Sequence, residues 1–96
     1  MTAYVLVLAE PRSDKSEELA QYAKATEPLR EAAGGKVVFR GPVARTIAGG
    51  DSPAMGIILE FPDAAAAASF FDNDAYRALT PLRDESFRRL QILILG

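Results

Sequence analysis

The sequence predicts a single α+β domain built as a βαββαβ plait, with a four-stranded antiparallel sheet and both helices on one of its faces. Apolar and helical segments follow each other in the order strand, helix, strand, strand, helix, strand over 96 residues. Right-handed crossovers place both helices of such a chain on the same side of the sheet. A chain of this length forms one modest core, so a second domain is not expected.

The clearest of these segments is an apolar strand that leads directly into an alanine-rich helix. Residues 55–61 are apolar on both faces except at Glu60, which is typical of a strand in the middle of a sheet. Pro62 cannot continue the strand pairing, and the side chain of Asp63 is suited to cap a helix over residues 64–71. Strand and helix are therefore expected to be joined without a loop.

The N-terminal part of the chain predicts another central strand and the first helix. Residues 4–8 are apolar at every position, and Pro11 ends their pairing. Asp14 stands three residues before Glu17, which is the spacing of a capping box, and a helix is expected from there to about residue 33, with a kink at Pro28 that leaves it continuous. A glycine pair after this helix supplies a left-handed C-cap. The inner stripe of the helix is expected to contain Leu19, Tyr22, Ala23, Leu29 and Ala33.

The middle of the chain predicts a hairpin at the edge of the sheet. Residues 36–40 form the third strand, which Gly41 and Pro42 interrupt as a bulge or an edge would, before residues 43–47 resume it. A turn-forming cluster at residues 48–53 joins this strand to the next one.

The C-terminal part completes both layers. The second helix is expected to break near Asp72, restart at Asp74, and end at Thr80 and Pro81. Residues 90–95 are apolar apart from Gln91 and predict the fourth strand.

Composition excludes several classes of function. Eleven Lys and Arg against thirteen Asp and Glu give a formal charge of −2, so no basic field attracts nucleic acid or an anionic membrane. The chain has no Cys and no His, which removes thiolate and imidazole metal ligands and the proximal histidine of haem proteins. We therefore expect no metal and no other cofactor. The chain opens directly with a strand and has no apolar run of about 18 residues, which indicates a cytoplasmic protein.

A second apolar sheet face predicts self-association. Leu6 and Leu8 alternate with Val5 and Val7, so the first strand is apolar on the helix side and on the opposite side. An uncovered apolar patch on the order of several hundred Å² is unfavourable for a monomeric protein. We predict a homodimer through the sheet face away from the helices.

Several short motifs occur along the chain in a fixed order. They are Ala3-Tyr4-Val5, Gly34-Gly35-Lys36, Phe39-Arg40-Gly41, Leu59-Glu60-Phe61-Pro62, Phe70-Phe71-Asp72, Asp74-Ala75-Tyr76 and Leu82-Arg83. Together they resemble the family of domain of unknown function 1330 (DUF1330). The resemblance implies a ferredoxin-like subunit that pairs with a second copy as a dimeric α/β barrel, and it implies no particular reaction.

Arg40 and Glu60 are the first candidate site residues. If Ile47 pairs with Ala54 in the hairpin, Arg40 lies level with Glu60 or with Phe61. Glu60 would then be the catalytic base for an enolising ligand, with Arg40 binding its negative charge. The structural alternative is a cross-strand ion pair near the sheet edge, worth at most about 1 kcal/mol.

Tyr22, Tyr76 and Arg83 are the other candidate ligand-binding residues. Tyrosine hydroxyls on a cavity wall and a guanidinium at its mouth suit a small carboxylate. The structural alternative is a pair of core tyrosines whose hydroxyls meet backbone carbonyls, with an arginine that caps a helix end.

These residues support two functional hypotheses. In the first, a homodimer binds or transforms a small oxygenated or carboxylate metabolite, without metal or haem, in a pocket between sheet and helices. In the second, the protein is a non-catalytic dimerising interaction module. An open pocket lined by the polar candidates favours the first hypothesis, and a space filled by apolar side chains favours the second. The filling side chains would be Phe39, Phe61, Phe70 and Leu82.

Overall fold

The computed structural model describes all 96 residues of the chain, which form one sheet and one helix layer. In chain order the elements are β1 (Ala3–Pro11), the short 3₁₀ helix η1 (Ser13–Lys15), α1 (Ser16–Ala32), β2 (Lys36–Pro42), β3 (Met55–Phe61), α2 (Ala64–Asp72), α3 (Asp74–Arg77), α4 (Thr80–Ser86) and β4 (Phe87–Leu95). The predicted alternation of strands and helices is confirmed. The helical region between β3 and β4 is divided into three helices.

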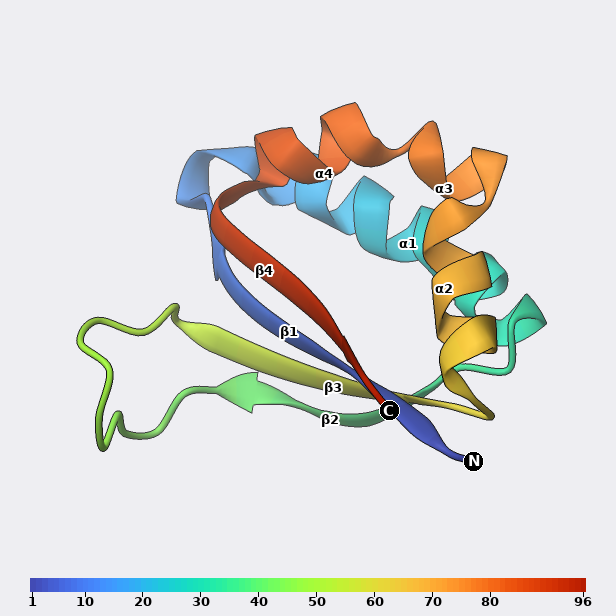
Figure 1. The fold of residues 1–96 in the computed structure, drawn as a ribbon. Coiled ribbons are helices and arrows are strands. Elements are labelled where there is room, and N and C mark those ends of the chain that lie inside the picture. The colour runs from blue at the N-terminus through green and yellow to red at the C-terminus, as the bar shows by residue number, and fades with distance from the viewer.

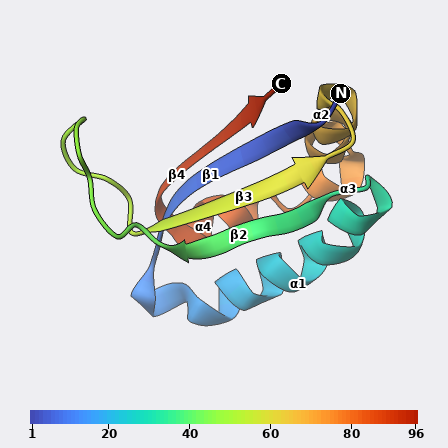
Figure 2. The same cartoon turned by 90° about the horizontal axis from the view of Figure 1, so that it is seen from below.

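The four strands form one antiparallel sheet with the order β2-β3-β1-β4. Figure 1 shows all the helices over one face of this sheet, and Figure 2 shows the opposite face without a helix. Strands β1 and β3 are central, and β2 lies at an edge, as predicted. The predicted α+β plait is therefore confirmed.

The hydrophobic core lies between the central strands and the helices α2 and α3. Val5, Leu59 and Phe61 point from the sheet toward Phe70 and Tyr76, and all five side chains are buried. The rings of Phe70 and Tyr76 are 5.1 Å apart, a separation at which an aromatic pair adds about 0.5–1.5 kcal/mol beyond its burial. In contrast, α1 has no buried residue. The core therefore occupies one end of the molecule and leaves space beneath α1.

Side-chain caps define the starts of α2 and α3. Asp63 accepts a hydrogen bond of 2.7 Å from an amide in the first turn of α2, which confirms the predicted N-cap. Asn73 does the same for α3 at 2.7 Å, so the predicted break is also confirmed. The predicted end at Thr80 and Pro81 is wrong, because these residues begin α4. Proline is tolerated in a first helical turn, where its missing amide would have no intrahelical partner.

The start of α1 also differs from the prediction. Asp14 does not cap the helix, because both of its carboxylate oxygens accept hydrogen bonds from Arg12, at 3.1 and 2.9 Å. Residues 13–15 form η1 instead. The prediction that α1 continues through Pro28 is confirmed, and Gly34, with φ of +82°, follows its C-terminus as expected for a left-handed cap.

Strand β2 contains a β-bulge at Val38. Of the two alternatives predicted at residues 41–42, the sheet edge is confirmed and the bulge is wrong. Val37 faces the helix layer, and the extra residue that follows it reverses the alternation of the side chains. As a result Phe39 points to the uncovered face and Arg40 points toward the helices. The bulge therefore decides which of the two side chains can reach the space beneath α1.

The hairpin between β2 and β3 closes earlier than predicted. The amide of Val43 donates to the carbonyl of Ala54 at 2.9 Å, so the predicted pairing of Ile47 with Ala54 is wrong. Residues 43–47 do not resume the strand. Pro42 is the last residue of β2, and its missing amide is consistent with the end of an edge strand.

The uncovered sheet face is apolar, as the sequence predicted. Leu6 of β1 lies between Ile58 of β3 and Leu93 of β4, and all three point away from the helices. Phe39 and Leu95 lie on the same face with 50% and 48% of their surface exposed. This face combines large apolar side chains from all four strands, which is unusual for a surface that remains in water.

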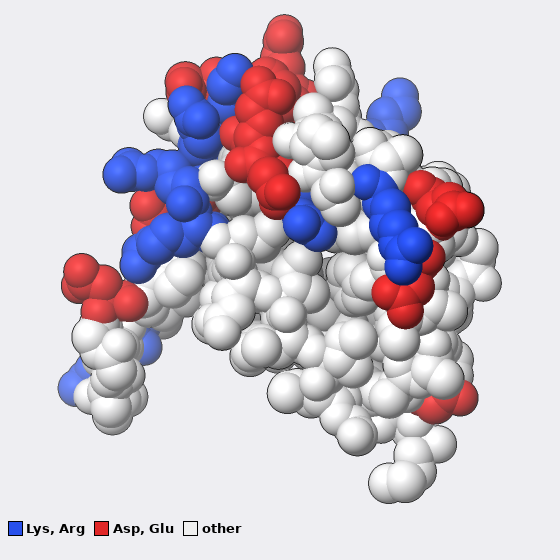
Figure 3. Space-filling model, turned by 45° about the horizontal axis from the view of Figure 1, so that its top comes forward, with Lys and Arg blue, Asp and Glu red and all other residues white.

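Charged side chains gather mainly over the helix layer, as Figure 3 shows. They are of both signs and partly paired there, for example Lys15 with Glu85 at 2.8 Å. No helix in the structure is long and apolar enough to cross a membrane. No group of three or more acidic residues converges in a geometry that could hold a metal ion.

Candidate functional site

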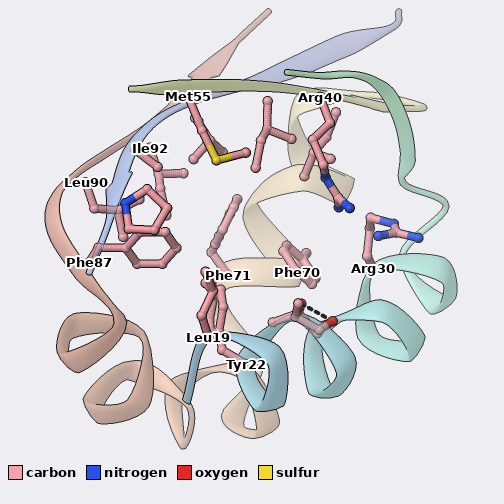
Figure 4. A pocket seen from close by; sticks show the side chains of 17 residues that line it. Leu19, Tyr22, Arg30, Arg40, Met55, Phe70, Phe71, Phe87, Leu90 and Ile92 are labelled. Atoms are coloured by element: carbon pink, nitrogen blue, oxygen red, sulfur yellow. Dashed lines mark hydrogen bonds between the residues drawn. The ribbon is translucent and has the colours of Figure 1, made fainter. Parts of the chain in front are cut away.

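A pocket of about 240 Å³ lies between α1 and the helix-facing side of the sheet. Thirteen of its 17 lining residues are hydrophobic, so the pocket is mainly an apolar space. Figure 4 shows that Met55 and Ile92 line it from the sheet, Leu19 and Tyr22 from α1, and Phe87 from the start of β4. The predicted inner stripe of α1 therefore contributes to a cavity wall.

The pocket exists because α1 packs sideways against the other helices and does not close on the sheet. Its main contacts are with α4. Tyr22 makes edge-on contacts with Phe87 and Tyr76, at ring separations of 6.2 and 6.3 Å. These aromatic contacts hold α1 in the helix layer, and the side chains of Leu19 and Ala23 face the space above the sheet without filling it.

Tyr22, Tyr76 and Arg83 form one connected group. The hydroxyl groups of Tyr22 and Tyr76 share a hydrogen bond of 2.8 Å, and Nη1 of Arg83 donates to the Tyr76 hydroxyl at 3.4 Å. Only Tyr22 lines the pocket, whereas Tyr76 is buried behind it. Tyr76 and Arg83 therefore support the pocket wall, and their role in ligand binding stays a prediction.

Burial raises the pKa of Tyr22 well above its usual value, and the hydrogen bond to Tyr76 adds to this effect. The folded protein holds this proton more tightly than the unfolded chain does. The resulting stability is fully present below the unfolded tyrosine pKa of about 10 and is lost as the pH rises beyond it. At neutral pH the Tyr22 hydroxyl is therefore a neutral group in the pocket wall.

The pH titration of tyrosinate absorbance tests this state of Tyr22. We expect wild type and Tyr22→Phe to show the same absorbance increase up to the pH at which circular dichroism reports unfolding, because Tyr22 stays protonated in the folded protein. An extra tyrosinate in wild type, with the circular dichroism still native, would show that the hydroxyl is accessible and ionises normally.

The predicted pairing of Arg40 with Glu60 is wrong. In the observed register Lys36 lies opposite Glu60, and Arg40 lies opposite Ile57. Glu60 also lies opposite Tyr4, on the uncovered face of the sheet. The reason is the hairpin, which closes with Val43 opposite Ala54, whereas the prediction assumed Ile47 in that place. Glu60 is therefore not part of this pocket and cannot act as a base on a molecule held there.

Two polar lining residues, Thr26 and Arg30, were missed by the sequence analysis. They follow Tyr22 at intervals of four residues on α1 and therefore lie on the same face of the helix. The hydroxyl of Thr26 donates to the carbonyl of Ala23 at 3.0 Å. In the sequence these two residues only extend the apolar stripe of the helix with polar side chains. The same pattern is expected where the buried face of a helix ends, so it did not indicate a pocket.

The fold and the pocket together define a small ferredoxin-like α+β protein with an apolar cavity between its sheet and its first helix. The chain belongs to the family described as domain of unknown function (DUF1330), which matches residues 2–96. The family resemblance seen in the sequence is therefore confirmed. No curated protein matches the chain.

Solved structures share the fold. A protein of unknown function from Rhodopseudomonas palustris is 23% identical with a TM-score of 0.80, over 98% of this chain and 80% of that one. A dimeric ferredoxin-like protein of unknown function from Jannaschia sp. is 15% identical with a TM-score of 0.72, over 100% and 99%. A protein from Nitrosomonas europaea, named by inference as an antibiotic biosynthesis monooxygenase, is 16% identical with a TM-score of 0.65, over 100% and 97%.

Proposed function

We propose that this protein is a homodimer whose subunits each bind a small, mainly apolar and oxygenated molecule in the pocket beneath α1. The observation that carries this proposal is the open pocket itself. Phe61 and Phe70 fill the core next to it, but the space between α1 and the sheet stays open. A module that served only to dimerise would have no physical reason to keep an apolar space of this kind unfilled.

The size of the pocket fits one small molecule. A cavity of about 150 Å³ holds a benzene molecule in a well-studied case, and the pocket here is about 240 Å³. A single substituted ring, or a branched molecule of similar size, therefore fits. Burying its apolar surface would contribute roughly 25 cal/mol per Å² to binding, before the entropy of association is subtracted.

The lining favours binding over proton transfer. Tyr22, Thr26, Arg30 and Arg40 are its polar members, and no carboxylate is among them. Arginine stays protonated in proteins, and the raised pKa of Tyr22 keeps its proton in place. The pocket thus offers hydrogen-bond donors for an oxygenated ligand without a side chain suited to act as a general base. The name of the Nitrosomonas europaea protein gives independent support for a small-molecule role on this fold.

The uncovered sheet face supports the homodimer. A second copy that lays its own sheet on this face would bury Leu6, Ile58 and Leu93 against their equivalents. The Jannaschia protein with the same fold is described as dimeric. A stable interface of this type buries about 1,200–2,000 Å² or more.

Ligand uptake is tested by blocking the pocket. In heteronuclear NMR we expect neutral benzyl alcohol to shift the signals of Ile57 and Ile92 in wild type, because both line the pocket. Ala23→Phe places a ring in the pocket from α1 and should reduce these shifts at least tenfold. Ala20→Phe, an exposed alanine of α1 outside the pocket, is the matched control and should leave them unchanged.

Absence of any shift in wild type with benzyl alcohol, phenylacetamide and phenylacetate would contradict the proposal. The interaction-module hypothesis would then replace it. Equal shifts in wild type and Ala23→Phe would place the binding elsewhere and would contradict it as well.

A further inference from the structure

We infer that Arg30 and Arg40 form an anion-binding end of the pocket and select a small organic acid whose body is apolar. This inference rests on the proposed function, because it names the ligand class of the same pocket. Figure 4 shows the two guanidinium groups at one end of the pocket, Arg40 pointing in from β2 and Arg30 from α1.

Arg30 has hydrogen-bond donors that no group of the chain accepts from. Its side chain is only 19% exposed, and its nearest carboxylate oxygen, on Glu31, is 3.9 Å from Nη2. Its Nε atom is buried and has no hydrogen-bond partner. A buried donor without an acceptor is unfavourable and rare in native proteins. A ligand oxygen at this end of the pocket would accept from the guanidinium group that lies there.

The position of Arg30 is fixed by the core. A Cβ atom on the buried Gly35 would lie 2.7 Å from the Cγ atom of Arg30 and 2.7 Å from the ring of Phe61. The aliphatic part of Arg30 therefore packs over a site that only glycine allows, and the Gly35 amide also donates to the carbonyl of Arg30 at 2.9 Å. This packing holds the guanidinium at the pocket in advance of binding, which reduces the entropy lost when a ligand is bound.

Arg40 has no partner within the chain. It faces the pocket because of the bulge at Val38, and its guanidinium is in none of the ion pairs of the structure. Both guanidinium groups stay charged at any physiological pH. Two cations that face the same apolar space repel each other unless an anion lies between them. No acidic residue lines the pocket, so a negatively charged ligand would supply the counter-charge that the chain does not provide there.

The opposite end of the pocket defines the rest of the ligand. Figure 4 places Phe87, Leu90 and Ile92 there, away from the two arginines. A ligand that spans the pocket therefore has its charged group between α1 and β2 and its apolar part against β4. Each guanidinium can bind a carboxylate through two parallel hydrogen bonds. The ligand class is thus a monocyclic or branched carboxylic acid with no charge in its body.

The test compares ligands of one shape and different charge on the wild-type protein. We expect phenylacetate to bind at least tenfold more tightly than phenylacetamide, measured by NMR titration of the pocket signals, and its affinity to fall with increasing salt. Benzylphosphonate serves as the phosphate-like arm and should bind more weakly than phenylacetate.

Substitution of each arginine tests whether the two guanidinium groups cause the preference for the carboxylate over the amide. Arg30→Gln and Arg40→Gln should each weaken phenylacetate binding about tenfold and leave phenylacetamide binding unchanged. Arg77→Gln is the matched control, because Arg77 lies outside the pocket and near Asp72 and Asp74. It should change neither affinity.

The outcomes separate this inference from the proposed function. Equal binding of phenylacetate and phenylacetamide would overturn the anion preference and leave the pocket proposal in place. Tighter binding of benzylphosphonate would overturn the assignment to a carboxylate. Failure of every compound to bind would contradict the proposed function itself.

Discussion

Leu93→Glu is expected to convert the proposed dimer into a monomer at micromolar concentration. Leu93 lies on the uncovered sheet face, on the edge strand β4, and is paired with Leu6 of the central strand β1. In a face-to-face dimer the new carboxylate would be buried without a partner, which costs several kcal/mol. Light scattering coupled to size exclusion measures the change directly. Leu6→Glu should have the same effect, because the two side chains are neighbours on the same face.

Ile94→Glu is the matched control for this prediction. Ile94 is the next residue along β4 and points to the other face of the sheet, with a similar exposure of 40% compared with 37% for Leu93. It should remain dimeric. A wild-type protein that is monomeric, or a Leu93→Glu variant that stays dimeric with native circular dichroism, would rule out this face as the interface.

Phe61→Ala is expected to lower the free energy of unfolding by about 3–5 kcal/mol. Phe61 is 1% exposed and lies at the centre of the core, where its ring is 5.8 Å from that of Phe70. Its removal leaves a cavity that the sheet cannot close. For a domain whose total stability is about 5–15 kcal/mol, this is a large fraction. Urea unfolding at one fixed protein concentration measures it, because the proposed dimer would add to the stability as the concentration rises.

Phe87→Ala provides the comparison. Phe87 is half-buried and one side of its ring faces the open pocket, so less packing is lost when it is truncated. We expect a smaller destabilisation than for Phe61→Ala. Equal losses in the two variants would mean that the pocket is closed and packed in solution, contrary to the structure.

The sheet and the helix layer could be predicted because they depend on signals repeated along the chain. The apolar character of β3 on both faces and the side chain of Asp63 at the start of α2 are local features, and both were interpreted correctly. The helix end predicted at Thr80 and Pro81 was wrong because a proline can end one helix or begin the next, and the local sequence is the same in both cases. The helix cap predicted at Asp14 was wrong because Arg12 takes up both oxygens of its carboxylate.

The candidate site was predictable only in part. Tyr22 was found from helix periodicity and does line the pocket. Arg40 also lines it, but the pairing with Glu60 that suggested its importance is wrong. The register depends on where the hairpin closes, at Val43 and Ala54, and several turn-forming residues in the loop allow more than one closing point. The bulge could not be predicted either, because Val38 carries no residue-type signal that distinguishes it from Val37. Arg30 was overlooked because its significance depends on Arg40, which reaches the same place from a different element.

The bulge at Val38 also has an evolutionary consequence. Because it reverses the alternation of β2, one additional residue sends Arg40 toward the pocket and Phe39 toward the uncovered face. If β2 ran through Val38 as a regular strand, the two would exchange faces, which would move a charge into the proposed interface and a phenyl ring into the proposed binding site. Point mutations can change ligand preference or assembly separately. Loss of the bulge with Val38 paired into the strand changes both at once, so we expect relatives that bind their ligands in this way to keep the orientation of these two positions more strictly than the residues that form the bulge.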